Sequence, residues 1–214
     1  DTLAICSDEN CGYKANVEVA DCITHNVESE KEELRKIETP NVKTIEGLKH
    51  KLGVEPTRMC KAVIYQENVS DDYVVVFIRG DLEVNETKLR NYLKTEVHPA
   101  TGVNEDCGIV AGFTGPVGFK AKAKVVFDRS LKNIESFVCG ANEKDFHYAG
   151  MNIERDVGNV VYVDVAKAYN GGVCPVCGKP TITLKRGVEV GNIFQLGTKY
   201  TKSMNMTYVD SDGT

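Results

Sequence analysis

The chain has 214 residues, of which 42% are hydrophobic and 27% charged, and its formal net charge is −5. These totals are ordinary for a soluble globular protein and allow one large domain or a medium domain with a small companion. The net negative charge argues against bulk electrostatic binding of nucleic acid, but it is compatible with binding of one nucleotide or a short single-stranded end. No apolar run approaches the roughly 20 residues that span a bilayer, so we expect no membrane partner.

The start of the chain predicts no signal peptide, because it has neither a basic region nor a long apolar stretch. Eight cysteines would suit a disulfide scaffold in a short secreted protein. At this length, and without a targeting segment, we expect a reducing cytoplasm in which the cysteines are free thiols or bind a metal.

Composition divides the chain into three zones. Residues 1–27 predict short strands around a turn, and the nearly all-charged residues 28–38 predict a solvated linker or exposed helix at a domain boundary. Residues from about 40 to 168 mix helical and strand patterns, which favours an α/β domain. Residues 171–214 predict strands and turns with a late helix.

Two helices are predicted in the middle zone. The first runs from Thr44, a suitable N-cap, to Gly53, a suitable stop. The second is capped by Asn85, and we expect three of its residues to turn inward: Leu89, Tyr92 and Leu93.

Strands alternate with these helices. Two apolar runs, at residues 58–66 and 73–80, predict a hairpin, and further strands are predicted at 122–131 and 159–168. Residues 136–152 are too polar for a core strand, and two glycines make them a poor helix, so we expect a loop there.

Four cysteines have metal-ligand spacing. Cys174 and Cys177 form C-P-x-C-G, a knuckle that turns two thiolates toward one metal, and Cys6 and Cys11 form a C-x4-C pair. Together they predict a tetrahedral zinc site, provided that the two ends of the chain pack together around an inserted middle zone. The alternative is four free thiols. The other four are expected to pack as small apolar residues: Cys22, Cys60, Cys107 and Cys139.

Three further features indicate a functional site only when they are taken together. Lys61 interrupts an apolar strand, which usually marks a sheet edge but also suits an ammonium at the floor of a pocket. The segment from Gly112 to Pro116 is either a simple turn or a loop whose backbone approaches a ligand closely. His147 alone is more often a hydrogen-bonded structural group than a catalyst, and no catalytic triad or phosphate-binding loop stands out.

Long motifs then occur in a recognisable order. They are "CGYKANVEVA", "TPNVKTIEGL", "KAVIYQ", "RGDLEVNETKL", "GFTGPVGF", "DRSLKNIESFVCGANEKDFHYAGMN" and "GVEVGNIFQLGTKYTKSM". In these motifs the whole chain resembles bacterial-type prolyl-tRNA synthetases, in their large insertion domain and the catalytic-domain strands that flank it. The insertion domain is similar to free-standing YbaK-type deacylases.

The resemblance implies an α/β (α+β) fold. A mixed, mostly antiparallel sheet or partial barrel with surrounding helices would form the insertion domain, residues 28–168. Residues 1–27 and 169–214 would form a small β-rich unit belonging to the class II catalytic domain. The ATP-binding and class II signature motifs are missing, so we do not expect this chain to aminoacylate. ATP and Mg would serve only the parent enzyme, which is expected to be a cytoplasmic homodimer.

The resemblance also implies an activity. A pocket built for proline cannot strongly reject the smaller alanine, because lost apolar contact gives only about 1–3 kcal/mol per methylene. A second site would therefore hydrolyse alanine from the acceptor end of tRNA(Pro) and exclude proline by size. Hydrolysis of this activated ester needs a positioned water and stabilisation of the carbonyl oxygen, but no cofactor. The tRNA ribose hydroxyl would help to position the water.

Site residues carry over from the family motif position by position. Lys61 and His147 would act on the acylated tRNA end, Lys61 by placement and charge and His147 by orienting the ribose. Ile45 and Leu48, after Thr44, would line the side-chain pocket. The loop with Gly112, Gly115 and Pro116 would approach the terminal adenosine. No general base is assigned.

Two alternatives remain open at this point. The chain could be a non-catalytic module that binds the tRNA end or supports the synthetase fold, although the presence of Lys61, the glycine loop and His147 together favours activity. It could also be a free-standing deacylase, against which the flanking synthetase segments argue. Asn192 stands where the family usually has histidine, which puts details of the parent's proline pocket in doubt.

Overall fold

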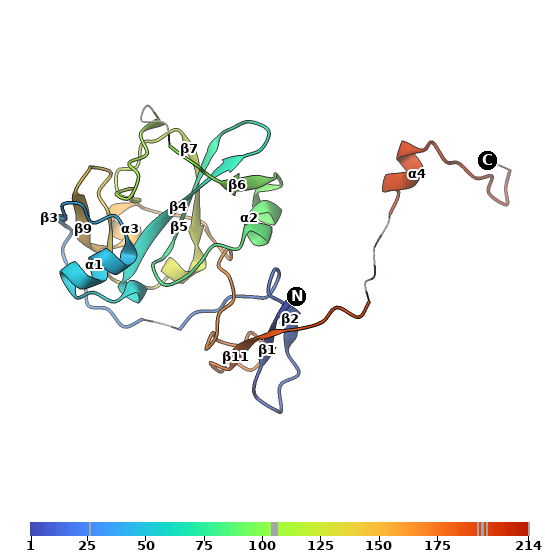
Figure 1. Ribbon diagram of the computed structural model, residues 1–214, viewed down its shortest axis with the longest axis horizontal. Helices are drawn as coiled ribbons and strands as arrows, with labels where there is room; N and C mark the ends of the chain where they lie inside the picture. The colour runs from blue at the N-terminus through green and yellow to red at the C-terminus, as the bar shows by residue number, and fades with distance from the viewer. Residues whose placement is uncertain (26, 104–106, 192, 194, 196, 214) are drawn as a thin grey trace.

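The computed structural model describes residues 1–25, 27–103, 107–191, 193, 195 and 197–213. Asn192 therefore lies outside the described residues. The chain forms an eight-stranded mixed sheet with helices on it and a separate three-stranded sheet below it (Figure 1). The expected α+β fold is confirmed. No helix in the described ranges is long and apolar enough to cross a membrane.

The elements follow one another without an internal repeat. The strands are β1 Thr2–Cys6, β2 Lys14–Asn16, β3 Arg35–Glu38, β4 Met59–Glu67, β5 Tyr73–Arg79, β6 Val97–Pro99, β7 Ala123–Asp128, β8 Phe137–Gly140, β9 Phe146–Met151, β10 Tyr162–Val163 and β11 Ile182–Arg186. The helices are α1 Ile45–Leu52, α2 Glu86–Leu93, α3 Ile153–Asp156 and α4 Lys199–Ser203.

The large sheet has the order β10-β7-β5-β4-β8-β9-β3, and β6 pairs with β4. The hairpin of β4 and β5 is antiparallel, as predicted, whereas β4 with β8 and β5 with β7 are parallel pairs. Strand β5 lies in the middle, and Val74, Val75, Val76 and Ile78 are fully buried. Because β5 is covered on both faces, its sequence is a continuous apolar run without alternation of apolar and polar residues.

Helix α1 begins and ends where its caps predict. The Thr44 side chain accepts a hydrogen bond from the Gly47 backbone N–H at 3.1 Å, and Gly53 ends the helix with a φ of 65°. Leu48 is buried in a cluster with Met59, so the helix lies against the sheet face that Met59 presents.

Helix α2 is also capped as predicted. The Asn85 side chain accepts from the Lys88 backbone N–H, and Leu89 is fully buried. The expectation for Tyr92 is wrong, because this side chain is 48% exposed. Helix α2 has only two turns, and its inward stripe is too narrow to include position 92.

Residues 136–152 form a hairpin, β8 and β9, so the expected loop is wrong. The polar residues that disguised it, 142–145, occupy the turn between the strands, while alternate residues of β9 point inward. Gly140 is required, because a Cβ there would lie 2.2 Å from the Phe113 carbonyl oxygen. Residues 35–38 likewise form strand β3 on the edge beside β9, rather than an exposed helix.

The small sheet joins both ends of the described chain. Strand β1 pairs with β2 and with β11, and the β1–β11 pairing joins residues 176 to 184 positions apart, from Cys6 with Ile182 to Thr2 with Arg186. It docks on the large domain through side chains such as Asn85, whose amide donates to the carbonyl oxygens of Val17 and Glu18. Beyond β11 the chain leaves the body, and α4 stands apart from both sheets (Figure 1).

Candidate functional site

A cavity of about 270 Å³ lies between the N-terminal end of α1, strand β4, the 112–114 loop and the β8–β9 hairpin. Six residues singled out in the sequence line it together: Thr44, Ile45, Leu48, Lys61, Gly112 and His147. The remaining lining residues are Lys43, Cys60, Ala62, Ile64, Thr114 and Gly140. Gly115 and Pro116 belong to the same loop but do not line the cavity.

The cavity exists because β4 changes partners. Strand β8 pairs with β4 only at Met59 and Cys60, and β6 pairs with it only from Tyr65 onward. Between these pairings, the side of β4 that faces away from β5 has no neighbouring strand in the described part of the chain. The Ile64 carbonyl oxygen accepts from the Ala100 N–H at 3.0 Å on this side, and by strand alternation the Ala62 N–H and C=O point the same way. Sequence reasoning missed this open edge, because it depends on pairing between distant segments.

Lys61 is half buried, and its Nζ donates a hydrogen bond to the Gly80 carbonyl oxygen at 3.0 Å. Burial lowers its pKa from the ordinary value, while the nearby carboxylates of Asp81 and Glu83 act in the opposite direction. The side chain is thus an ammonium at the wall of a small cavity rather than one extended into open water.

His147 is 3% exposed and lies on β9, between Ile37 of β3 and Gly140 of β8. Its Nδ1 is 2.5 Å from the hydroxyl oxygen of Thr39, and that hydroxyl also donates to the Asp145 carbonyl oxygen at 3.3 Å. If the hydroxyl proton goes to the Asp145 carbonyl oxygen, which can only accept, Nδ1 carries its own proton. Nε2 is then left as a hydrogen-bond acceptor.

Burial also sets the charge of this imidazole. It lowers the pKa of His147 to about 4, so the ring is neutral at neutral pH. The Phe113 ring packs beside it, with the ring centroids 5.4 Å apart. Thr39 was not found from the sequence, since a threonine 108 positions away gives no local signal of this contact.

The glycine loop is held tightly against β8. A Cβ at Gly115 would lie 1.8 Å from the Gly140 carbonyl oxygen, so any side chain would push the loop away. Asn142 clasps the loop: its side chain accepts from the Gly115 N–H and donates to the carbonyl oxygens of Gly115 and Val117, at 2.9 to 3.0 Å. Gly112, with a φ of 83°, brings the backbone next to Lys43. Gly115 and Asn142 thus position the loop from outside the cavity.

The cavity contains one thiol, and its surroundings argue against nucleophilic catalysis. Cys60 is fully buried, and burial raises its pKa well above the usual range, so the thiolate that would attack a carbonyl is not formed. What remains is an apolar wall from Ile45 and Leu48, two lysine ammonium groups, two threonine hydroxyls, one neutral imidazole and backbone polar groups. Such a set can bind and orient a small polar molecule with a short apolar side chain.

The four cysteines with metal-ligand spacing meet between the two ends of the chain. Their Sγ atoms all lie within 4.8 Å of one another, and the closest approaches, Cys6 with Cys177 and Cys11 with Cys174, are both 3.7 Å. Zinc bound at about 2.3 Å by four thiolates places its ligands roughly 3.8 Å apart, so this donor set fits a tetrahedral ion. A hydrogen bond from the Lys179 backbone lowers the pKa of Cys177 to about 7, which favours the thiolate form.

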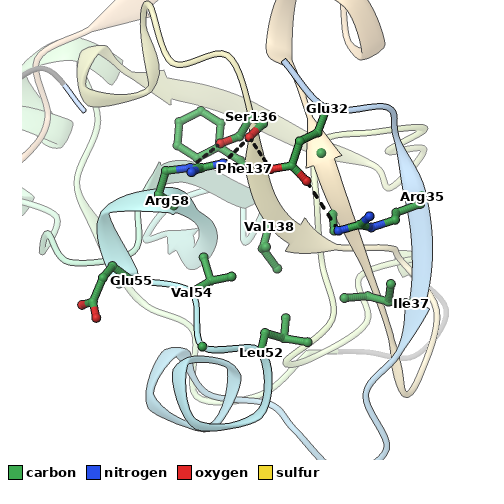
Figure 2. Close-up of a pocket in the computed structure, with 13 residues that line it drawn as sticks. Glu32, Arg35, Ile37, Leu52, Val54, Glu55, Arg58, Ser136, Phe137 and Val138 are labelled. Carbon is green, nitrogen blue, oxygen red and sulfur yellow. Dashed lines mark hydrogen bonds and ion pairs between the residues drawn. The ribbon is translucent and has the colours of Figure 1, made fainter. Parts of the chain in front are cut away.

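A larger cavity, of about 600 Å³, lies at the other end of α1 (Figure 2). Its floor is apolar, with Ile37, Leu52 and Val138, and its rim carries charges. These charges are already paired, since Arg58 binds Glu32 at 3.0 Å and also the Ser136 hydroxyl. None of the candidate site residues predicted from the sequence lines it, so the smaller cavity is the candidate functional site.

Comparison with known proteins defines the class. The model of the aminoacyl-tRNA editing domain family matches residues 39–154, a range that holds every residue lining the smaller cavity. The chain belongs to this family. Two crystal structures share the fold: a hypothetical protein, 22% identical with a TM-score of 0.54, and a protein described as a candidate trans-editing enzyme for prolyl tRNA synthetase, 14% identical with a TM-score of 0.52. Each covers 63% of this chain, and the chain covers 92% and 87% of them.

Over almost its whole length the chain is also similar to proline–tRNA ligases. The ligase of Caldicellulosiruptor bescii is 41% identical over 95% of the chain, and that of a Sulfurihydrogenibium species is 44% identical over 96%. The ligase of Bacillus velezensis is 39% identical over the full chain. The chain spans only 36 to 38% of the length of these relatives.

Proposed function

We propose that this chain is the editing part of a proline–tRNA ligase and hydrolyses alanine from mischarged tRNA(Pro). The observation that carries the proposal is that Lys61, Gly112 and His147, far apart in sequence, share one small cavity with the apolar Ile45. An alanine methyl group suits a space of about 270 Å³ that must also hold part of a ribose. A pyrrolidine ring would need the room that Ile45 and Leu48 fill, so size would decide which ester enters.

The proposed mechanism places an activated ester rather than attacking it with a side chain. The Lys61 ammonium would stabilise charge on the acylated end, and the backbone at Gly112 would lie close to the terminal adenosine. The neutral His147 would accept a hydrogen bond at Nε2 from a ribose hydroxyl, with Thr39 holding its other nitrogen. The ribose hydroxyl would position the attacking water. No residue is assigned as general base.

The remaining domain organisation follows from the same proposal. Residues 28–168 would be an insertion in the synthetase, and residues 1–27 and 169–214 would be pieces of its catalytic domain. Proline ligation with ATP and Mg, dimer formation and the anticodon contacts would then belong to the parent enzyme in the cytoplasm.

We also propose that the four cysteines bind a structural zinc ion. The support is the match between their sulfur separations and a tetrahedral thiolate site. The ion would close the small sheet by joining β1, the turn after it and the knuckle before β11. It would take no part in hydrolysis, because the cysteines lie in a different cluster from the residues of the small cavity.

The test is a deacylation assay with Ala-tRNA(Pro) and Pro-tRNA(Pro) as separate substrates. We expect the alanyl ester alone to be hydrolysed and Lys61→Ala to reduce its rate by roughly 100-fold or more, with the melting temperature kept. Lys122→Ala, which removes an exposed lysine of the same charge, is the matched control. If the chain binds Ala-tRNA(Pro) tightly without hydrolysing it, the chain is a tRNA-binding module and the proposed deacylase activity is wrong.

A further inference from the structure

The ammonium of Lys61 has a defined acceptor outside the cavity lining. On the β4–β5 hairpin Lys61 lies opposite Ile78, and its side chain extends past the end of β5 to the carbonyl oxygen of Gly80, 3.0 Å from Nζ. The turn that follows β5 therefore decides where this charge lies in the cavity wall.

That turn is fixed by close packing. The Gly80 N–H donates to the Met59 carbonyl oxygen at 2.7 Å, and the Leu82 N–H donates to the Arg79 carbonyl oxygen at 3.1 Å. A Cβ at Gly80 would lie 2.6 Å from the Pro56 carbonyl oxygen and 2.9 Å from the Cβ of Met59. The Gly80 backbone thus has little freedom to turn its carbonyl away from Lys61.

The two residues beside Gly80 form an ionic clasp across it. Arg79 is 2% exposed, and its Nε and Nη2 donate to the two carboxylate oxygens of Asp81 at 2.6 and 2.9 Å. Its Nη1 donates to the His25 carbonyl oxygen at 3.1 Å, on the segment that enters from the small sheet. A bidentate pair of this kind fixes geometry as well as charge.

The charges around Lys61 are unevenly placed. The acidic groups that act on it, Asp81 and Glu83, both follow β5, and they oppose the effect of burial on its pKa. On the other walls of the cavity lie the cation of Lys43 and the neutral imidazole of His147. Glu83 is 76% exposed and pairs with Lys167, so water screens much of its effect. Asp81, whose side chain is 25% exposed, has the larger electrostatic effect on Lys61 of the two carboxylates.

We propose that Asp81 is a positioning residue for the hydrolysis: clasped by Arg79, it holds the Gly80 carbonyl against Lys61 and keeps the ammonium charged at the cavity wall. The role of Asp81 in hydrolysis rests on the proposed function. The ion pair between Arg79 and Asp81 is a feature of the fold and does not depend on that function. In this role Asp81 acts through Gly80 and Lys61 rather than by contact with the substrate.

The experiment compares Asp81→Asn with Asp81→Glu. The amide removes the charge but still offers Arg79 an oxygen, and the glutamate restores the charge. For Asp81→Asn we expect kcat for Ala-tRNA(Pro) to fall roughly 10- to 100-fold and the alkaline limb of the pH–rate profile to move to lower pH. Asp81→Glu should return the limb toward the parent position. Glu96→Gln, the same charge change on an exposed pair with Arg90, is the matched control.

A second measurement separates this inference from the proposed function. The lysines are dimethylated with a carbon-13 label, Lys61 is assigned by its loss in Lys61→Arg, and its titration is followed by NMR. A lower Lys61 pKa in Asp81→Asn supports the clasp even in a chain without deacylase activity. If Asp81→Asn lowers only the melting temperature, with both the titration and the pH–rate profile unchanged, Asp81 is merely structural and the inference fails.

Discussion

Thr39 lies 2.5 Å from Nδ1 of His147, in a contact that is buried between strand β9 and the end of β3. The threonine is itself fixed, since its backbone N–H donates to the Asp145 carbonyl oxygen at 2.7 Å. His147 lines the small cavity, and the Thr39 contact at Nδ1 restricts the orientation of its ring. The buried threonine therefore determines which nitrogen of His147 can meet a ligand.

Replacing Thr39 with valine should disturb both stability and activity. Valine has the same shape but no hydroxyl, so Nδ1 of His147 loses its hydrogen-bond partner inside the protein. We expect a loss of about 1–3 kcal/mol in the free energy of unfolding, measured by urea titration, and a deacylation rate at least roughly tenfold lower. Thr39→Ser keeps the hydroxyl and should retain most of both properties. Equal rates for valine and serine would show that the ring is held by packing alone.

His147 should also make folding sensitive to acid. Its pKa is about 4 in the folded chain against an ordinary 6.5, because burial disfavours the charged ring. Above pH 6.5 neither state binds the proton, and below it the unfolded chain binds a proton that the folded chain refuses until about pH 4. Stability should therefore fall as the pH drops from 6.5 to 4, by up to about 3 kcal/mol from this residue.

The measurement is urea unfolding at several pH values for the parent chain and His147→Gln. Glutamine does not titrate, so the slope of stability against pH between 6.5 and 4 should become shallower. His50→Gln, at an exposed histidine of α1 that pairs with Glu46, is the matched control. An unchanged slope in His147→Gln would mean that His147 is protonated in the folded chain.

The size of the cavity should set its selectivity. Ile45 lines the cavity and is only partly buried, so Ile45→Ala enlarges the space at a smaller stability cost than truncation of the buried Leu48. We expect hydrolysis of Pro-tRNA(Pro) to rise relative to Ala-tRNA(Pro) by roughly 10-fold or more, because a clash is removed. Ile37→Ala, in the larger cavity beyond α1, tests whether general loosening has the same effect. Selectivity that stays the same in Ile45→Ala would place the proline filter elsewhere.

The four cysteines should bind one metal ion per chain. Elemental analysis of the purified chain should find zinc, and a strong chelator should remove it and increase hydrogen exchange in β1, β2 and β11. The large sheet has its own core and should keep its protection. Cys174→Ser should abolish binding, whereas Cys107→Ser, outside the cluster, should not. If Cys174→Ser binds zinc as tightly as the parent chain, the four cysteines are not the ligand set.

Local chemistry made part of this fold predictable from sequence. The caps Thr44 and Gly53 define α1 because a hydroxyl and a left-handed residue satisfy the helix ends within a few positions. The β4–β5 hairpin was likewise visible, since two apolar runs flank a short polar turn. In each case the signal and the structure that it specifies lie next to each other in the chain.

Features that depend on distant segments were not predictable in this way. The hairpin of β8 and β9 looked like a loop because the partner that satisfies His147 lies more than 100 positions earlier. The open edge of β4 arises only when β8 and β6 pair with different parts of one strand. The Asn142 clasp on the glycine loop depends in turn on that hairpin. Thr39 and Asn142, which support the cavity without lining it, were therefore among the residues missed.

Gly115 offers a test of how the loop and the cavity depend on each other. Its missing Cβ would lie 1.8 Å from the Gly140 carbonyl oxygen, and backbone on both sides leaves no flexible side chain to yield. Gly115→Ala should therefore push the loop off β8 and break its hydrogen bonds to Asn142, costing roughly 2–4 kcal/mol of stability. Gly102→Ala, where an added Cβ meets nothing within 4 Å, is the matched control. Because Gly112 moves with the loop, deacylation should fall even at temperatures where Gly115→Ala remains folded. If the variant folds, loses stability and still hydrolyses Ala-tRNA(Pro) at the parent rate, the loop backbone has no part in placing the ester, and Lys61 and His147 carry the site without it.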